Sequence, residues 1–231
     1  MSTRAAPGDA AGVNSPAVSS PATSSAATTG GVPGARSDGE RRSGPGAFRR
    51  RLLDGLAAEL AAGSYRDATV AGIVRRARTS RRTFYQHFAD RDECFVTLMA
   101  ETTGEMVRYV SEAVDETEPW PEQVRSAVEA WFAYAEAEPA IVVSWIRDVP
   151  ALGDKARQLQ RMQLDGFVTL AQRLRQRAEL RGAGAPVPRE SVIILLGGLR
   201  ELVATTVEDG GSLDGVVESA VHAAVSLLTP Q

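Results

Sequence analysis

Apolar residues recur at intervals of three and four along most of the chain after residue 47, which is the period of an amphipathic α-helix. The first such stripe consists of Leu52, Leu53, Leu56 and Leu60, and it predicts a helix over residues 48–62. A second stripe begins at Val70 and predicts a short helix, for which Thr69 is a suitable N-cap. Helical periods continue to residue 228, so the pattern predicts an all-α fold of about nine helices.

A break at residues 78–80 separates the second helix from the third, and Ser80 is a suitable N-cap for the third. Phe84 and Phe88 lie four residues apart, so both rings fall on one face and can anchor this helix to a core. The other face carries donors to phosphates or base edges, namely Arg81, Arg82, Tyr85, Gln86 and His87. Two short helices joined by a tight turn, with the second one basic and polar outside, are typical of a helix-turn-helix.

The chain after this motif predicts six further helices. Asp90 and Glu93 have the spacing of a capping box and indicate the start of a fourth helix, over about residues 92–114. The others are expected at residues 121–138, 141–149, 154–181, 189–208 and 213–228, with breaks at proline and glycine. The inner face expected for the 154–181 helix consists of Leu159, Met162, Gly166, Phe167, Leu170 and Leu174.

The last two predicted helices are the clearest amphipathic pair, and their apolar stripes are wide and rich in small or β-branched residues. The first stripe carries Ile193, Leu196, Leu199, Val203 and Val207. Gly197 and Gly198 lie inside the same helix, where each glycine costs about 1 kcal/mol, so they indicate a close backbone approach. Either the pair packs within one monomer or it forms a four-helix bundle with a second copy.

The helix-turn-helix residues resemble the DNA-binding domain of the tetracycline-repressor (TetR) family. The resemblance lies in residues 73–77, 79–88 and 90–93, above all in Thr83-Phe84-Tyr85-Gln86-His87-Phe88. It covers residues 48–98 closely and the rest only by the layout of its helices. It implies a DNA-binding domain over residues 46–92 and a helical regulatory and dimerisation domain over residues 93–231.

Two positions depart from the family pattern. Arg78 stands where the turn usually carries glycine, and an L-residue with positive φ costs about 1 kcal/mol. Arg82 stands at the second position of the recognition helix, where the family often has a small residue that lets the backbone approach DNA.

Chemistry assigns roles to the predicted DNA-binding residues. The planar fork of arginine suits the acceptors of guanine in the major groove, so Arg81 and Arg82, with Gln86, are the candidates for base contacts. Tyr85, His87 and Arg91 are expected to hold phosphates. The resemblance adds a phosphate contact at the start of the second helix, through Thr69 with Arg66, and Ser80 and Thr83 complete the set. The alternatives are a half-buried ring for Tyr85 and plain solvation for the two arginines.

The net charge of −3 hides a strong segregation along the chain. Residues 35–91 hold 13 arginines and 6 acidic residues, whereas residues 92–231 hold 12 basic and 22 acidic residues. This split places a positive field on the helix-turn-helix alone and favours a polyanion partner. The single cysteine, Cys94, fits a reducing cytoplasm and is interpreted as a small buried residue rather than a redox sensor.

Residues 1–45 are rich in Ala, Ser, Thr, Gly and Pro and contain few large hydrophobes, so we expect disorder there. This tail is expected to end in a basic arm with Arg36, Arg41, Arg42, Arg49, Arg50 and Arg51. The arm is a candidate for contact with the DNA backbone or minor groove, and the alternative is a solvated charge run.

The resemblance implies a cytoplasmic transcription regulator, a repressor that binds a palindromic operator as a homodimer through its last two helices. A small molecule would bind among helices four to eight and release the DNA. Candidate pocket residues are Trp131, Tyr134, Trp145, Arg147, Met162 and Phe167, with core packing as the alternative for the rings. No membrane segment, metal cluster, cofactor motif or catalytic motif is found, so an enzyme is not expected. A helical protein-interaction adaptor without specific DNA binding is the alternative function.

Overall fold

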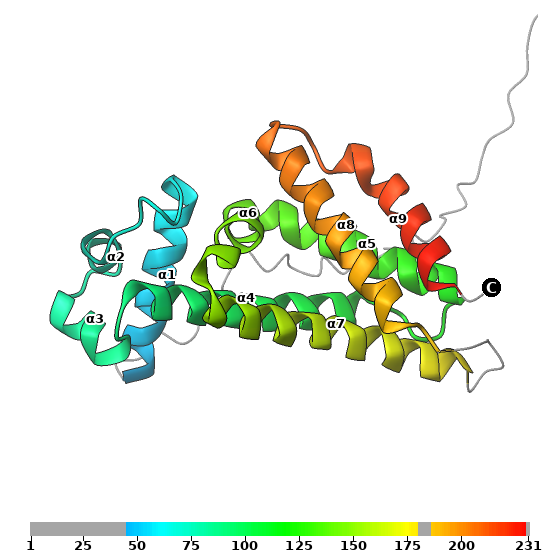
Figure 1. Ribbon diagram of the computed structural model, residues 1–231, viewed down its shortest axis with the longest axis horizontal. Coiled ribbons are helices and arrows are strands. Elements are labelled where there is room, and N and C mark those ends of the chain that lie inside the picture. Colours follow the sequence, from blue (N-terminus) through cyan, green and yellow to red (C-terminus); the bar gives the residue numbers. More distant parts are fainter. Residues whose placement is uncertain (1–44, 180–185, 230–231) are drawn as a thin grey trace, which may run out of the picture. The chain divides into compact units, whose positions relative to one another are not determined.

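The computed structural model describes residues 45–179 and 186–229, and within these ranges every regular element is helical, as predicted. Figure 1 shows the order of the elements. They are α1 (Pro45–Ala62), α2 (Val70–Arg76), α3 (Arg81–His87), α4 (Arg91–Ala113), α5 (Trp120–Ala137), α6 (Pro139–Arg147), the 3₁₀ helix η2 (Val149–Leu152), α7 (Asp154–Glu179), α8 (Arg189–Glu208) and α9 (Asp214–Leu228). None of these helices is long and apolar enough to cross a membrane.

The start of α1 corrects one prediction. The helix begins three residues before the expected residue 48, and Arg49, Arg50 and Arg51, which were also assigned to the basic arm, lie within it. Arg49 pairs with Glu101 of α4, which fixes the side chain on the protein surface. The other expected arm residues and the tail over residues 1–44 lie outside the described residues.

Two clusters of buried hydrophobic residues divide the described structure. The first joins α1, α2 and α3 to the first turns of α4 and extends to α6, η2 and the start of α7. The second joins the rest of α4 to α5, α7, α8 and α9. The first cluster contains Phe84 together with four residues of α4, namely Cys94, Phe95, Leu98 and Met99. The predicted domain boundary between residues 92 and 93 therefore divides this cluster. Helix α4 contributes to both clusters.

Helices α1 and α2 cross at very short range because of Gly55. A Cβ atom at this position would lie 2.7 Å from the carbonyl oxygen of Ile73 and 3.2 Å from the backbone nitrogen of Ala77. Ile73 itself is fully buried. The absence of a side chain at residue 55 therefore sets how closely α2 packs on α1.

The inner face of α7 differs from the prediction at one position. Met162 is 58% exposed, whereas Gln163 is buried and accepts a hydrogen bond from Arg200 of α8. Leu159, Gln163 and Phe167 follow one another at four-residue intervals, so they lie on one face of α7. Met162 lies outside this face. The sequence pattern placed Met162 on the inner face because methionine is apolar. In the structure Gln163 can lie there instead, because its side-chain oxygen accepts a hydrogen bond from Arg200.

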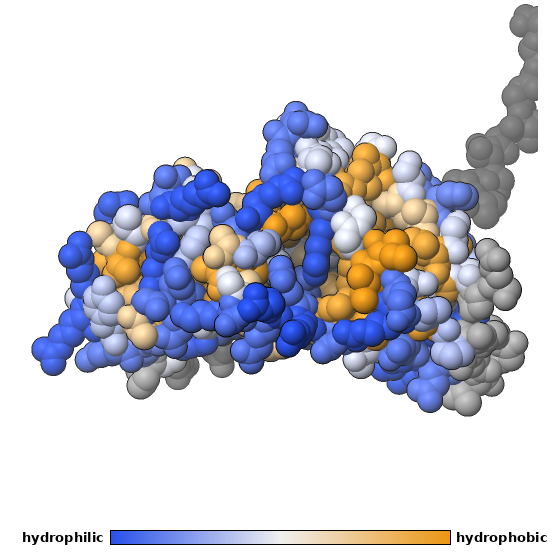
Figure 2. Space-filling view, viewed as in Figure 1, coloured by the Kyte–Doolittle hydropathy of each residue, from blue (hydrophilic) through white to orange (hydrophobic). Residues whose placement is uncertain are grey.

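Apolar side chains remain on the surface of α8 and α9. Leu196, Leu199 and Val203 of α8 are buried as predicted, but Ile193, expected on the same stripe, is exposed together with Ile194. Leu227 adds an exposed apolar side chain on α9. Figure 2 shows apolar surface gathered over these two helices.

Candidate nucleic-acid interface

Helix α3 has the two faces that its sequence predicts. Phe84 and Phe88 are buried with their ring centroids 5.7 Å apart. On the opposite face Tyr85 is 59% exposed. Arg81, Arg82 and Gln86 are exposed beside it, whereas Thr83 and His87 are half-buried. One face of the helix is therefore buried by its phenylalanine rings, and the other presents two guanidinium groups, a phenol and an amide to solvent.

Both helices of the motif start at the predicted caps. The side-chain oxygen of Thr69 accepts a hydrogen bond from the Gly72 backbone N–H at 3.0 Å, and that of Ser80 accepts one from Thr83 at 3.1 Å. The hydroxyl groups of Ser80 and Thr83 are also 2.9 Å apart. These bonds satisfy N–H groups that lack a partner inside the helix. Thr69 is exposed beside the start of α2, as a phosphate contact requires.

The turn between α2 and α3 adopts the strained conformation expected for its sequence. Arg78 has a φ of +48°, in the left-handed region that favours glycine. Arg51 of α1 donates hydrogen bonds to the Ala77 carbonyl at 3.0 Å and to the Arg78 carbonyl at 2.6 Å. Sequence reasoning included Arg51 in a basic arm that was only a candidate for DNA contact. In the structure its hydrogen bonds stabilise the turn, which offsets the backbone strain.

Arg91 lies at the start of α4, but its guanidinium group is directed toward the corner between α1 and α2. It donates hydrogen bonds to the carbonyls of Ala68 at 2.8 Å and Tyr65 at 3.2 Å, and it lies 4.3 Å from the ring centroid of Tyr65. The Tyr65 ring also stacks on Phe95 at 3.9 Å. Because these contacts occupy the group, they favour a positioning role for Arg91 over direct contact with phosphate.

The remaining charges leave the recognition face positive. Arg75 and Arg76 both pair with Glu59 of α1, so part of their charge is compensated. Arg81 and Arg82 make no ion pair with any described residue. A surface of this kind attracts polyanions and can form bidentate bonds to guanine.

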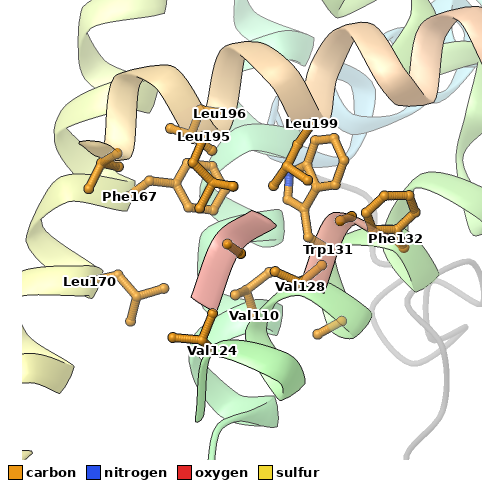
Figure 3. Close-up of a cluster of buried hydrophobic side chains, with 14 of the residues drawn as sticks. Val110, Val124, Val128, Trp131, Phe132, Phe167, Leu170, Leu195, Leu196 and Leu199 are labelled. Atoms are coloured by element: carbon orange, nitrogen blue, oxygen red, sulfur yellow. The ribbon is translucent and has the colours of Figure 1, made fainter. Parts of the chain in front are cut away.

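A second candidate site is an apolar cavity enclosed by α4, α5, α7, α8 and the end of α9 (Figure 3). The cavity has a volume of about 80 Å³, which is smaller than most small-molecule sites, and part of it is open to solvent. Trp131 and Phe167, two of the six predicted pocket residues, line it. Figure 3 shows them with Leu170, Leu195 and Leu199 around the same space.

The other four predicted pocket residues lie elsewhere. Tyr134 donates to the Thr102 carbonyl at 3.3 Å, and Trp145 donates to the Thr103 hydroxyl at 2.8 Å, so both rings are core residues with satisfied polar groups. Arg147 pairs on the surface with Glu201 and Glu208, and Met162 is exposed. Sequence reasoning missed Trp120 and Gln123, which line the cavity at the first turn of α5.

Cys94 is fully buried in the first cluster. Burial raises the pKa of its thiol to about 12, so the group stays protonated at neutral pH. This agrees with the interpretation of Cys94 as a packing residue. No group of three or more metal-binding side chains is found within the described ranges.

The fold and the two sites define a class of protein: a helix-turn-helix module joined to a helical domain that contains an apolar cavity. Residues 52–98 match the family of bacterial regulatory proteins known as the tetR family. Residues 52–98 are therefore similar to the DNA-binding part of that family.

Solved structures have the same fold as most of this chain. The transcriptional regulator FadR from Bacillus subtilis, in complex with stearoyl-CoA, is 17% identical, with a TM-score of 0.65 over 77% of this chain and 97% of that one. The fatty acid degradation regulator FadR from Bacillus halodurans is 19% identical, with a TM-score of 0.67 over 81% and 97%. A TetR-family regulator from Mesorhizobium loti has 15% identity and a TM-score of 0.65 over 80% and 98%. No curated protein sequence matches the chain.

Proposed function

We propose that this chain is a ligand-responsive transcription regulator, a repressor, that binds a palindromic operator as a homodimer. The observation that carries the proposal is the outer face of α3, where Arg81, Arg82 and Tyr85 are exposed over buried phenylalanine rings. An exposed helix of this composition in a helix-turn-helix suits the major groove. The segregation of positive charge onto the same module supports a DNA partner.

Fluorescence anisotropy with the chain's own promoter region tests this proposal. We expect a sequence-specific complex whose affinity falls steeply with salt, because phosphate contacts release counterions. Scrambled DNA of the same length and composition is the control. Equal binding to both DNAs, or binding insensitive to salt, would favour the protein-interaction adaptor.

Base contacts and positioning residues should give different mutational signatures. Arg81→Ala or Arg82→Ala is expected to reduce discrimination at particular operator positions by about 1–3 kcal/mol, because a bidentate contact to guanine is lost. Tyr85→Phe and Arg91→Ala are expected to weaken binding to all sequences alike, through a phosphate contact and through the α1–α2 corner respectively. Anisotropy with single-base operator variants at fixed salt measures both effects. Uniform losses for all four variants would remove the arginines from base recognition.

The exposed surface of α8 and α9 supports dimerisation. Ile194 is 61% exposed, and a Cβ atom added at Gly197 or Gly198 would meet nothing within 4 Å. Glycines on a helix surface let a partner helix approach closely, and the exposed isoleucines supply area that a partner would bury. A two-fold dimer also matches an operator with two half-sites.

Ile194→Lys is expected to raise the dimer dissociation constant about 30-fold or more, because a charge would be buried in the interface without a partner. Sedimentation velocity over a concentration series measures this change. Met162→Lys is the matched control, since Met162 is exposed to a similar degree on α7. A dimer that tolerates Ile194→Lys as well as it tolerates the control would exclude this surface as the interface.

The cavity supports control by a small molecule. A ligand shifts the protein between states only if it binds one of them better, and α4 joins the cavity cluster to the helix-turn-helix cluster. The similar Bacillus subtilis regulator is described with stearoyl-CoA, which carries a long apolar chain. The apolar lining here suits an apolar ligand body as well.

A further inference from the structure

Two buried polar atoms, on residues that line the apolar cavity, have no hydrogen-bond partner among the described residues. They are the indole Nε1 of Trp120 and the side-chain Oε1 of Gln123, and both atoms are buried. Both residues line the cavity. Buried polar groups in native proteins are nearly always satisfied, so such a pair indicates a missing partner.

The orientation of the Gln123 amide is fixed by its neighbours. Its Nε2 donates hydrogen bonds to the Glu118 carbonyl at 2.8 Å and to the Glu116 carbonyl at 3.3 Å. Turning the amide over would place oxygen against these two carbonyl oxygens, so the Oε1 atom stays an acceptor. Trp120 can only donate. Because the two residues are three apart in α5, they present one donor and one acceptor on the same helix face.

We propose that the ligand of this cavity is an uncharged amphiphile with one hydroxyl group, which accepts a hydrogen bond from Trp120 and donates one to Gln123. This inference rests on the proposed function in taking the cavity as the effector site. A hydroxyl group is both donor and acceptor and can complete the pair. A carboxylate or an ether oxygen only accepts and leaves Gln123 unsatisfied, whereas an ammonium group only donates and leaves Trp120 unsatisfied.

The surroundings also disfavour a charged group. Aliphatic and aromatic side chains form the rest of the lining, and an ion loses its hydration there without a compensating partner. Arg175 of α7 has its guanidinium carbon 5.0 Å from the Trp120 ring centroid, and it is not among the lining residues.

Isothermal titration of the full chain without DNA tests the proposal with three probes of similar size: 1-octanol, its isomer 1-methoxyheptane, and octanoate. We expect 1-octanol to bind about tenfold more tightly than the ether, which has the same atoms but no donor. Octanoate is expected to bind more weakly than the alcohol. Equal affinities for alcohol and ether, tighter binding of octanoate, or no binding of any probe would overturn the proposed ligand class.

Two variants separate the donor from the acceptor. Trp120→Phe keeps an aromatic ring but removes the donor. It is expected to weaken the binding of 1-octanol and of the ether by a similar factor, about fivefold to tenfold. Gln123→Met is expected to abolish the preference for alcohol over ether. Trp145→Phe is the matched control, because Trp145 is equally buried but bonds to Thr103 and does not line the cavity. A preference that persists in Gln123→Met would overturn the assignment, and circular dichroism verifies that each variant is folded.

These titrations are independent of the operator measurement. Loss of alcohol selectivity with intact operator binding would overturn the ligand class alone. Absence of specific operator binding would overturn the proposed function, whatever the probes do.

Discussion

Phe84→Ala is expected to lower the free energy of unfolding by about 3–5 kcal/mol, because a fully buried ring is lost from the first cluster. Helix α3 has only 7 residues and is too short to persist without its anchor. Operator binding is expected to disappear together with this stability. Urea denaturation followed by circular dichroism measures the change.

Tyr85→Ala is the matched control, since it removes a ring from the adjacent position on the exposed face. We expect it to change stability by less than about 1 kcal/mol while still weakening DNA binding. If both variants lost stability to the same extent, the assignment of one buried and one exposed face to α3 would be wrong.

Gly55→Ala is expected to destabilise the chain by about 2 kcal/mol, although alanine is the better helix former. The added methyl group would lie 2.7 Å from the Ile73 carbonyl oxygen, and a backbone atom can move aside only if α2 shifts on α1. A displaced α2 would also move Thr69 out of the position proposed for its phosphate contact. Thermal and urea denaturation measure the loss of stability, and operator anisotropy measures the second effect.

Gly104→Ala provides the opposite expectation in the same experiment. Gly104 lies within α4, and a Cβ atom there would meet nothing within 4 Å, so helix propensity alone should stabilise the chain by about 0.5–1 kcal/mol. If Gly55→Ala were also stabilising, the close crossing of α1 and α2 would be refuted.

The helix-turn-helix could be predicted well because its signals are local. Thr69, Ser80 and Asp90 each cap a helix through a bond within the next three residues, and Phe84 and Phe88 share a face by spacing alone. The roles of Arg51 and Arg91 could not be predicted in this way. Both donate to carbonyls more than 20 residues away in the chain, and only tertiary structure brings these groups together.

The cavity was harder to predict for a related reason. Large aromatic residues at helical spacing identify an inner face, but they do not tell packed core from open space. Trp131 and Phe167 line the cavity, whereas Tyr134 and Trp145 have a similar sequence context but pack in the core. Gln123 gave no signal, because a lone glutamine in an amphipathic helix is ordinarily assigned to the solvent side.

The hydrophobic cluster that α4 shares with the helix-turn-helix limits how this chain can be rebuilt by protein engineering. A chimera joined between residues 92 and 93 would separate Phe84 from Phe95, Leu98 and Met99, and it would leave Trp145 and Leu159 facing a foreign surface. The transplantable module is therefore not the helix-turn-helix alone. A designer who wants to exchange operator specificity should carry over the matching faces of α4, α6 and the start of α7, or exchange only the exposed residues of α3.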